Sequence, residues 1–535
     1  MTVKLRIPLA VAALIVLGAV SAFAQTVNLS VTGPTGSAFQ WLGPRASAGL
    51  GSSLERADMS GDVNRIDLIA GAPGAGPGGE GQVYIVFMGP TWSTASIASA
   101  ASVILTGSAS ADRFGAATSP GAVTTSDGSS RDLVVGAPGA FGGRGAVYLF
   151  RGPFSQGDRR SASSAVFTVL GGANDHLGSR VATADLDGDG FRDIVMSAPT
   201  TGRLYVIFGG AALSGTRDVS AAAADITITV DPGAVSLAAG DFNGDGFTDL
   251  AVGDPMAGAA GAVYVVNGKA RAALASVIPA TSADTVFSGV DGGDGAGTTV
   301  DAADFDGDGR SDLIVGAPGA AGPGNTRPGA GEAYVLFGKS TFGASASLAS
   351  AAASIIYGAH AGDHLAAAIS AGNVRRDLPD DLLLLAPGAS PAGDINVVYG
   401  APKSSIGATI DLAVGIDRVV RGDPAGAPLQ NMVTTQITGK GVDIVAAAPA
   451  APLAGGTAGS GVLFAALSPT LVLTPPTTTI TVAQGATATV NVSVKNLGTM
   501  TAGWTARSNT SWLATSPLSG TATAATAGVL TLTIT

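Results

Sequence analysis

A short motif recurs seven times along this chain, and the recurrence limits the possible folds more than any other feature of the sequence. Each copy has an Asp, a short apolar run and a Pro six positions after the Asp, as in Asp-Leu-Val-Val-Gly-Ala-Pro-Gly from Asp132. The seven copies begin at Asp67, Asp132, Asp193, Asp249, Asp312, Asp381 and Asp443. Successive copies lie 56 to 69 residues apart. A period of this length indicates one array of repeated units rather than several unrelated domains, although the chain has 535 residues.

Each repeat contains several strand signals and no helical pattern. The apolar run after the Asp is short and ends at Gly-Ala-Pro or a variant of it, which is typical of a strand buried on both faces. A second run follows a Gly, at Gly81, Gly145, Gly202, Gly261 and Gly331, with weaker copies from Asp394 and Gly461. A further run precedes the next repeat, for example Val103 to Leu105, Phe167 to Val169 and Ile226 to Ile228. We therefore expect about four strands per repeat.

Four-stranded units at a fixed period predict a β-propeller, in which each sheet packs on its neighbours and radial closure protects the sheet edges. A linear β-solenoid is the alternative, but its coils are much shorter than these units. The sequence thus predicts an all-β protein with a seven-bladed propeller over residues 25–467. Val27 to Val31 precede the first complete repeat, and we expect this segment to give the last blade an outer strand that closes the ring.

The N-terminal residues 1–24 have the features of a signal peptide. Lys4 and Arg6 precede an apolar run from Val11 to Val20, and Ala22-Phe23-Ala24 fits a cleavage pattern before Gln25. A membrane anchor is the alternative, although the run is short. The chain has no Cys, so its stability does not come from disulfides. We expect an exported protein, in the periplasm, at the cell surface or outside the cell, without membrane insertion after cleavage.

The charge of the chain argues against two classes of partner. The formal net charge is −11, and 39 acidic residues outnumber 28 basic ones. Nucleic acids and anionic membrane surfaces require a basic patch, so neither is an expected partner. An acidic exported chain is better suited to binding cations.

Three repeats carry an acidic loop of nine residues that ends at the repeat Asp. Positions one, three, five and nine supply side-chain oxygens, Gly at position six allows a sharp turn, and position seven supplies a backbone carbonyl. Such a set suits Ca²⁺, which takes six to eight oxygen ligands, better than Mg²⁺. The candidate ligands are Asp185, Asp187, Asp189, Phe191 and Asp193 in one loop; Asp241, Asn243, Asp245, Phe247 and Asp249 in the next; and Asp304, Asp306, Asp308, Arg310 and Asp312 in the third. We therefore expect about three Ca²⁺ sites.

These loops differ from EF-hands, because position twelve is Met196, Val252 or Val315 within a strand run instead of a Glu before a helix. Acidic β-turns without metal are the alternative, since Asp and Gly also favour turns. Repulsion among four carboxylates favours the cation site. The loop of the first repeat keeps Asp58, Ser60, Asp62 and Asp67, which leaves a weak fourth site open. The loops before Asp132, Asp381 and Asp443 lack most ligands and are expected to turn without metal.

The repeats resemble FG-GAP repeats, the blades of the integrin α-subunit propeller, over about four-fifths of the chain. The resemblance rests on loops of the form DxDGDGxxDLxVGAPG and on turns such as Asp175-His176-Leu177-Gly178 and Asp363-His364-Leu365; Phe114-Gly115 keeps the literal FG. It implies that calcium binds structurally on the face of the propeller opposite the ligand-binding loops. One GAP has become GDP at Gly253, and nothing in the chain resembles an integrin β-subunit or its membrane anchor.

Residues 468–535 are richer in Thr and Val and predict a small Ig-like β-sandwich after the propeller. Alternation in Thr479 to Val482 and Ala488 to Val494 indicates half-buried strands. Trp504 and Trp512 are expected in its core rather than on a ligand platform. The segment resembles BACON-type modules, which implies a glycan- or surface-binding role. A final strand, Val529 to Thr535, reaches the end of the chain, as a truncated product would.

No catalytic constellation emerges from the sequence, so we expect a non-enzyme. His176, His360 and His364 are its three histidines, and two of them occupy the same turn position of different repeats. Arg421-Gly422-Asp423 spells an integrin-ligand tripeptide but falls where other repeats have a Gly-Asp turn. The leading hypothesis is a calcium-binding propeller that binds proteins or glycans at the cell surface. The alternatives are an accessory propeller of a secreted hydrolytic or glycan-degrading system and a structural envelope protein.

Overall fold

The computed structural model describes two sets of residues. In the repeat region these are residues 25–28, 39–62, 66–88, 95–126, 131–233, 235–374, 379–416, 418–422, 427–435, 443–451 and 461–466. In the C-terminal region they are the strands 471–474, 488–496, 502–505, 513–516, 519–522 and 528–534. The predicted signal peptide and the predicted domain boundary at residues 467 and 468 lie outside the described residues.

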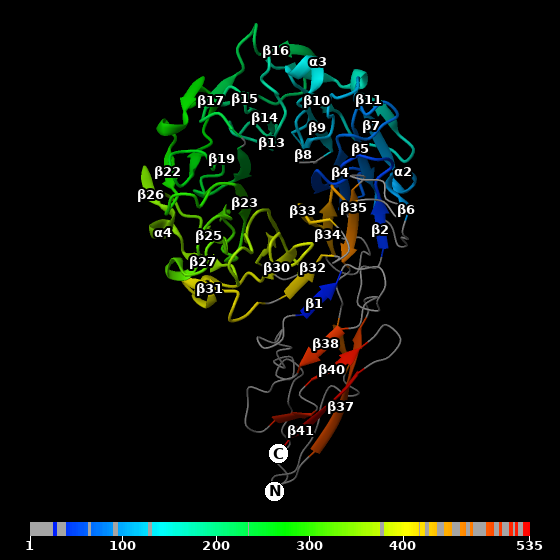
Figure 1. Cartoon of the computed structure of the whole chain (residues 1–535), viewed down its shortest axis with the longest axis vertical. Coiled ribbons are helices and arrows are strands. Elements are labelled where there is room, and N and C mark those ends of the chain that lie inside the picture. Colours follow the sequence, from blue (N-terminus) through cyan, green and yellow to red (C-terminus); the bar gives the residue numbers. More distant parts are fainter. Residues whose placement is uncertain are drawn as a thin grey trace.

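Seven five-stranded sheets surround a common axis, which confirms the all-β, seven-bladed propeller (Figure 1). We number the blades after the seven repeats. The innermost strands are β3 (Ser53–Ala57), β8 (Ala117–Gly121), β13 (Val181–Ala184), β18 (Ser236–Gly240), β23 (Thr299–Ala303), β28 (Ile369–Gly372) and β33 (Asn431–Thr435). Each contacts the innermost strands of both neighbouring blades, so that together they form a ring around the axis.

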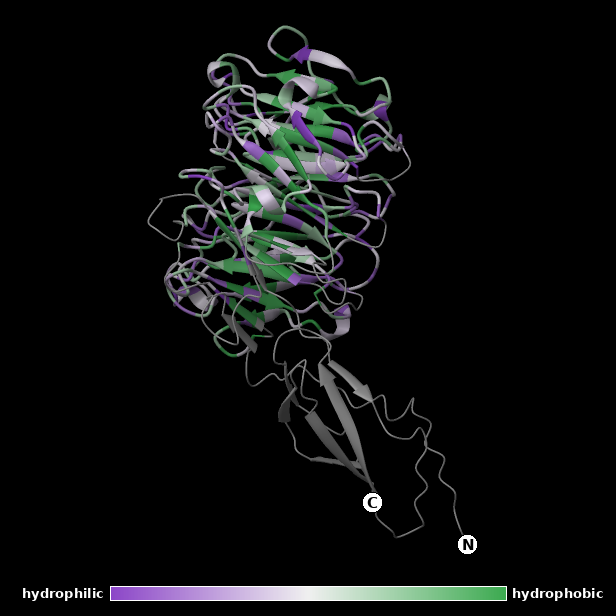
Figure 2. Cartoon of the chain, turned by 90° about the vertical axis from the view of Figure 1, so that its right-hand side faces the viewer, coloured by the Kyte–Doolittle hydropathy of each residue, from purple (hydrophilic) through white to green (hydrophobic). Residues whose placement is uncertain are grey.

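The second strand of each blade begins at the repeat Asp and is buried along its whole length. These strands are β4 (Asp67–Ala72), β9 (Asp132–Ala137), β14 (Asp193–Ala198), β19 (Asp249–Asp254), β24 (Asp312–Ala317), β29 (Asp381–Ala386) and β34 (Asp443–Ala448). Apolar clusters between blades hold them, as where Leu204 packs in one cluster with Leu250 of the next blade. Figure 2 shows the apolar residues along the strands and the polar ones mainly in the loops. The prediction of strands buried on both faces is confirmed.

The third and fourth strands complete an antiparallel sheet with the first two. The third strands are β5 (Gln82–Val86), β10 (Ala146–Phe150), β15 (Arg203–Ile207), β20 (Ala262–Val266), β25 (Glu332–Leu336), β30 (Asp394–Val398) and β35 (Val462–Ala466). The fourth strands of the first six blades are β7 (Val103–Thr106), β12 (Phe167–Leu170), β17 (Ile226–Thr229), β22 (Thr285–Ser288), β27 (Ser354–Tyr357) and β32 (Arg418–Arg421). The weaker copies from Asp394 and Gly461 therefore do form strands.

Each sheet also has a fifth, outermost strand that the sequence did not predict. It is short, runs parallel to the fourth strand and, in the first five blades, comes from the following repeat. These strands are β11 (Arg159–Ser161), β16 (Gly215–Asp218), β21 (Val277–Pro279), β26 (Ser345–Ser347) and β31 (Thr409–Asp411). They escape detection because two to four mostly polar or small residues carry no alternation pattern. Every repeat thus lends a strand to the preceding blade before completing its own.

The N-terminal segment closes the ring through two strands rather than one. β1 (Gln25–Asn28) pairs in parallel with β32 and is the fifth strand of the sixth blade. β2 (Phe39–Leu42) then pairs with β35 as the fourth strand of the seventh blade, whose fifth strand is β6 (Ala95–Ser96). The prediction that Val27 to Val31 joins the last blade was therefore wrong for Val27 and Asn28, and residues 29–31 lie outside the described part of the chain. The segment follows the same order as every other repeat, so its first strand goes to the preceding blade.

Helices are few and short in the described part of the chain. They are α2 (Ile97–Ala100), α3 (Ala140–Gly143) and α4 (Leu348–Ala351), together with the 3₁₀ turns η1 (Ala162–Ser164), η2 (Arg271–Ala273), η3 (Ala280–Ser282), η4 (Pro323–Asn325) and η5 (Lys403–Ser405). No helix among the described residues has the length and apolar character needed to span a bilayer.

The C-terminal region forms two further sheets. β36 (Leu471–Thr474), β37 (Ala488–Asn496), β41 (Gly528–Ile534) and β39 (Leu513–Ser516) form one, and β38 (Ala502–Thr505) pairs with β40 (Ser519–Ala522) in the other. The predicted strand Ala488 to Val494 lies within β37, whereas Thr479 to Val482 and Trp512 fall outside the described residues. The Ig-like assignment stays a prediction.

Candidate metal sites in the acidic loops

The three acidic loops connect the first and second strands of the third, fourth and fifth blades. Because these blades are neighbours, the loops lie on one face of the propeller, side by side. The segment after the third strand of the next blade covers each loop: the carbonyl oxygens of Leu186, Phe242 and Phe305 accept from the N–H groups of Lys269, Lys339 and Ala401 at 2.9, 3.0 and 3.1 Å. Each loop therefore joins two blades.

Glycine at loop position six has the backbone conformation that the predicted turn requires. Gly190, Gly246 and Gly309 have φ values of 89°, 89° and 88°, which side chains rarely tolerate. In each loop the carboxylate at position one accepts from the N–H of this glycine, at 3.0 to 3.1 Å. This bond folds each loop back on its first residue.

The fifth-blade loop has the geometry of a cation site. One carboxylate oxygen from each of Asp304, Asp306 and Asp312 lies within 4.8 Å of the others. Asp304 Oδ1 and Asp306 Oδ2 are buried and have no hydrogen-bond partner, and Asp306 is only 4 % exposed. An unpaired buried carboxylate oxygen is costly. A bound cation would remove this cost, so the residues present fit Ca²⁺.

The third-blade loop also converges, but a side chain from another blade occupies part of it. Oxygens of Asp185, Asp187 and Asp189 lie within 4.8 Å of one another. Arg271, in η2 after the third strand of the fourth blade, forms an ion pair through Nε with Asp187 Oδ2. Its Nη2 also lies 2.9 Å from Asp189 Oδ2. A protein cation therefore already neutralises part of this loop.

The fourth-blade loop differs at position three, where Asn243 replaces Asp. Its amide donates to Asp245 Oδ2 at 2.9 Å, and its carbonyl oxygen accepts from the N–H of Asp245 at 2.8 Å. Asp241 accepts from three backbone N–H groups of the loop. Within the described residues, the carboxylates of this loop are not among the convergent groups. A cation here would require the Asn243 side chain to turn.

The Asp at position nine has a structural role that does not depend on metal. Asp193, Asp249 and Asp312 each accept, through one oxygen, from the N–H at loop position two and, through the other, from the N–H of Gly209, Gly268 or Gly338 after the third strand. Asp132 and Asp381 make the same pair of bonds in blades whose loops lack the acidic residues. The repeat Asp thus ties the second strand to both flanking segments, and in the fifth-blade loop Asp312 also converges with Asp304 and Asp306.

Burial makes the charged form of these carboxylates unfavourable without a cation. It raises the pKa of Asp193 to about 8, with Asp187 and Asp185 adding to the effect against the hydrogen bonds of Gly209 and Leu186. Burial likewise raises the pKa of Asp312 to about 7 and that of Asp249 to about 6. The pKa of Asp306 is raised as well, first by burial and then by Asp308. A divalent ion would restore the charged forms.

Side chains at position seven link neighbouring loops. A Cβ on Gly188 would lie 2.6 Å from the Phe247 ring, and one on Gly244 would lie 2.8 Å from Arg310 Nε. The side chains of Phe247 and Arg310 therefore cover the third- and fourth-blade loops, respectively. The predicted ligand at position seven remains the backbone carbonyl of Phe247 and Arg310 rather than their side chains, as it does for Phe191 of the third-blade loop.

The other loops bear on the remaining predictions. In the first blade, Asp58 Oδ1 accepts from Gly61 N–H at 2.7 Å, and Asp67 Oδ2 accepts from Met59 and Ser60 N–H at 3.0 Å. Asp62 N–H lies 3.3 Å from Ser60 Oγ, but residues 63–65 fall outside the described part. A weak fourth site stays a prediction. In the second blade, Thr124 fills the turn through hydrogen bonds to Asp132.

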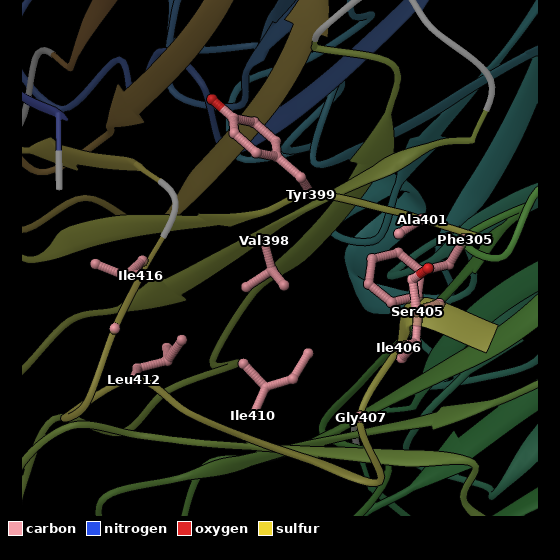
Figure 3. A pocket seen from close by; sticks show the side chains of 11 residues that line it. Phe305, Val398, Tyr399, Ala401, Ser405, Ile406, Gly407, Ile410, Leu412 and Ile416 are labelled. Atoms are coloured by element: carbon pink, nitrogen blue, oxygen red, sulfur yellow. The ribbon is translucent and has the colours of Figure 1, made fainter. Parts of the chain in front are cut away.

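A pocket of about 300 Å³ adjoins the fifth-blade loop (Figure 3). Phe305, at loop position two, lines it together with Val398, Ile410 and Leu412. Its lining is mostly apolar and comes from the segments that follow the third strand of the sixth blade. None of its lining residues is a candidate ligand.

The histidines take part in turns, whereas Arg421 of the Arg-Gly-Asp tripeptide lies in a strand. His176 and His364 both have φ of 53° in equivalent turns, and their Nδ1 atoms lie 3.1 Å from Thr200 Oγ1 and 3.0 Å from the Pro318 carbonyl. His360 Nδ1 lies 3.4 Å from Asp363 Oδ2. Arg421 ends strand β32 and pairs with Asp394 at 3.2 Å, whereas Asp423 falls outside the described residues. Arg421 is therefore held within a sheet rather than on a free loop.

Sequence comparison agrees with this architecture. The family model for the FG-GAP repeat matches residues 177–207, 233–266 and 296–336, which carry the three acidic loops. Phosphatidylinositol-glycan-specific phospholipase D of Rattus norvegicus is 34% identical over 176 residues, or 28% of this chain and 20% of that protein. Integrin alpha-PS5 of Drosophila melanogaster is 33% identical over 159 residues, or 27% of this chain and 15% of that protein. The chain thus spans at most about a fifth of these relatives.

Among solved structures, the WD40 domain of Toxoplasma gondii coronin aligns with 83% of this chain and 88% of its own, at a TM-score of 0.43 and 12% identity. The blade topology itself, rather than this alignment, establishes the propeller. Together, the seven-bladed topology, the matched repeats and the similarity to an integrin α chain show that this chain contains an integrin-α-like FG-GAP β-propeller.

Proposed function

We propose that the chain is an exported, non-catalytic propeller that is stabilised by Ca²⁺ and binds a protein or glycan at the cell surface. The observation that carries the calcium part is the fifth-blade loop, where two buried carboxylate oxygens lack partners and three carboxylates converge. Because each loop joins two blades, a bound cation would stabilise the contact between them. Its role would be structural.

The strand order separates the calcium loops from the proposed binding face. The connections between second and third strands, and between successive blades, lie at the opposite ends of the strands. Three large apolar side chains are exposed in these connections: Phe141 at 57%, Met256 at 64% and Val290 at 42%. Connecting loops on a rigid scaffold commonly carry binding residues. These three side chains are our candidates for contacts with a partner.

A second candidate function is an accessory propeller of a secreted hydrolytic or glycan-degrading system. The observation in its favour is the similarity to part of a phosphatidylinositol-glycan-specific phospholipase D. In that case the propeller would position a separate catalytic unit. A structural envelope role without a soluble ligand is the third possibility.

The test is a glycan-array screen of the chain from Gln25 to Thr535, in millimolar Ca²⁺ and in EDTA, together with calorimetric Ca²⁺ titration. The proposal expects saturable Ca²⁺ binding and saturable glycan or protein binding that weakens in Phe141→Ala and Met256→Ala. Val277→Ala is the matched control, because Val277 is 59% exposed but lies on the outer strand β21. Absence of Ca²⁺ binding would overturn the calcium part, and substrate turnover by the isolated chain would overturn the non-catalytic part.

A further inference from the structure

One side-chain atom has a different environment in each of the three acidic loops. At position three, one oxygen of Asp187, Asn243 or Asp306 accepts from the N–H of position five, at 3.3, 2.8 and 3.1 Å respectively. The other terminal atom of this side chain is therefore equivalent in all three loops. In Asp187 and Asp306 it is a carboxylate oxygen, which could ligate a cation.

The partners of that atom differ. In the fifth blade it is Asp306 Oδ2, which is buried and unpaired. In the fourth blade it is the amide nitrogen of Asn243, which donates to Asp245. In the third blade it is Asp187 Oδ2, which is paired with Arg271 Nε although the Asp187 side chain is fully buried. The oxygen available to a metal in one loop is thus occupied by a protein cation in another.

Arg271 is held in this position by more than one contact. Its Nη2 reaches Asp189 Oδ2 at 2.9 Å, so the guanidinium spans loop positions three and five. Its Cζ lies 4.4 Å from the centre of the Phe208 ring, a cation–π distance. Two residues earlier, the Lys269 N–H donates to the Leu186 carbonyl at 2.9 Å and fixes the backbone against the loop. A planar guanidinium bound to two carboxylates is preorganised.

The corresponding cation of the fifth-blade loop, Lys403, acts on Asp306 only through space: its charge opposes the rise that burial causes in the pKa of Asp306. Lys403 lies in η5, after the third strand of the sixth blade, as Arg271 lies in η2 after that of the fourth. Its Nζ is 5.1 Å from the Phe337 ring centre, and Asp306 Oδ2 keeps no hydrogen-bond partner. Lysine is also a flexible point charge without the fork of arginine. The fifth-blade loop therefore stays open to an external ion.

We propose that Arg271 is an internal counter-ion that competes with Ca²⁺ for the third-blade loop. This loop then binds Ca²⁺ more weakly than the fifth-blade loop. In calcium-free conditions Arg271 preserves the contact between the third and fourth blades. The inference rests on the proposed calcium function, which it refines by ranking the sites and naming the residue responsible.

The test uses Arg271→Gln in the full chain, both alone and with Asp304→Asn and Asp306→Asn, which remove the fifth-blade site. Ca²⁺ binding is measured by calorimetry, and thermal unfolding is followed in EDTA and in Ca²⁺. We expect R271Q to tighten binding at the third-blade loop about ten-fold, the change that 1.4 kcal/mol produces. We also expect the Tm of R271Q to be lower than that of the wild type in EDTA, and the addition of Ca²⁺ to restore it.

Two variants serve as controls. Arg217→Gln breaks the Arg217–Asp225 ion pair, 3.0 Å long and on the outer strand β16, and is expected to leave Ca²⁺ affinity unchanged. Arg271→Lys keeps the charge and is expected to remain closer to the wild type than R271Q. Because the Arg271 side chain is 52% exposed, its replacement is expected to leave the fold intact.

Unchanged or weaker binding in R271Q would overturn the inference while leaving the calcium function standing, provided the wild type binds at the fifth-blade loop. The strongest support would come from the chains that lack the fifth-blade site. In these, the inference expects Ca²⁺ binding when R271Q is present and none when Arg271 is retained. Loss of all Ca²⁺ binding in every chain, wild type included, would overturn the proposed calcium function and the inference with it.

Discussion

Trp41 in strand β2 lies opposite Leu463 in strand β35, so the beginning and the end of the repeat region share one sheet. Both side chains are fully buried, within a cluster that joins the sixth, seventh and first blades. Without β2, the third strand of the seventh blade would have an open edge. Radial closure protects sheet edges only when the last blade is complete.

Truncation of this closing contact is expected to be costly. Trp41→Ala removes the largest side chain that is fully buried among the described residues and should lower the free energy of unfolding by about 3–5 kcal/mol. Urea denaturation measures the change. Phe141→Ala removes a solvent-exposed aromatic ring and should change it by less than about 0.5 kcal/mol. Equal effects of the two substitutions would show that β2 does not close the ring.

The blade count followed from the sequence because each repeat contains a strongly apolar strand that starts at the same Asp. The strand that closes the ring could not be assigned from the sequence in the same way. Gln25 to Asn28 and Phe39 to Leu42 are each four residues long, and their order becomes clear only when the exchange of outer strands is known. That exchange is carried by short segments such as Arg159–Ser161, whose pairing depends on position in space rather than on local hydrophobicity.

The repeat Asp is expected to stabilise blades that hold no metal. Asp132 is 2% exposed; its oxygens accept from Thr124 N–H at 2.7 Å, Thr124 Oγ1 at 2.8 Å and Gly152 N–H at 3.1 Å. Asp132→Ala would leave these donors unpaired and should cost about 2–5 kcal/mol. Thermal and urea unfolding measure the loss, and calorimetry should give an unchanged Ca²⁺ stoichiometry.

Asp218→Ala is the control for Asp132→Ala. It breaks the Arg144–Asp218 ion pair, whose side chains are about one-third exposed, and should lower the stability far less than Asp132→Ala does. A loss of Ca²⁺ sites in the Asp132 variant would contradict the view that this residue acts through backbone hydrogen bonds alone.

Removal of Ca²⁺ should lower the thermal stability of the propeller, because the loops bind the ion only when folded. At 100 times the Kd, one site contributes about 2.7 kcal/mol. Asp306→Asn replaces a carboxylate oxygen that has no protein partner, so we expect its Tm to depend less on EDTA than that of the wild type. Differential scanning calorimetry in Ca²⁺ and in EDTA measures both effects. Identical EDTA responses of the two chains would exclude the fifth-blade site.

The sequence identified the acidic loops because their ligands are local, within nine residues. It did not identify Arg271, since the contact with Asp187 depends on which blades are neighbours. A signal for it existed only in the repeat alignment, where Arg271 and Lys403 occupy similar places after the third strand. The spacing of the loop residues also did not reveal that Asp306 and Asp187 have different hydrogen-bond partners, because both residues occupy position three of the same motif.

The axial ring of the propeller predicts a pH dependence that is separate from the calcium loops. Glu55 on β3 is half-buried, and its pKa is raised to about 8, first by burial and then by Asp301 on β23, against the opposing charge of Arg56. Arg56 is directed elsewhere, to Thr434 and to the Ala371 carbonyl at 3.2 Å. Asp301 Oδ2 accepts from the Ala371 N–H at 2.8 Å, and the pKa of Asp301 is itself raised, first by burial and to a smaller extent by Asp380.

The sign of the pH effect follows from the raised pKa of Glu55. In the unfolded chain a Glu titrates near pH 4.3, so between that pH and about 8 the folded state holds a proton that the unfolded state has released. The contribution of Glu55 to the stability is therefore fully present below about pH 4 and is lost as the pH rises toward 8. Glu55→Gln should flatten this fall, match the wild type near pH 5 and exceed its Tm at pH 8. Asp284→Asn, which removes an exposed carboxylate paired with Lys269, controls for net charge. Thermal unfolding is measured in saturating Ca²⁺, because the bound ion keeps the acidic loops charged at every pH. Parallel curves of Tm against pH for Glu55→Gln and the wild type would show that the titrating group lies elsewhere.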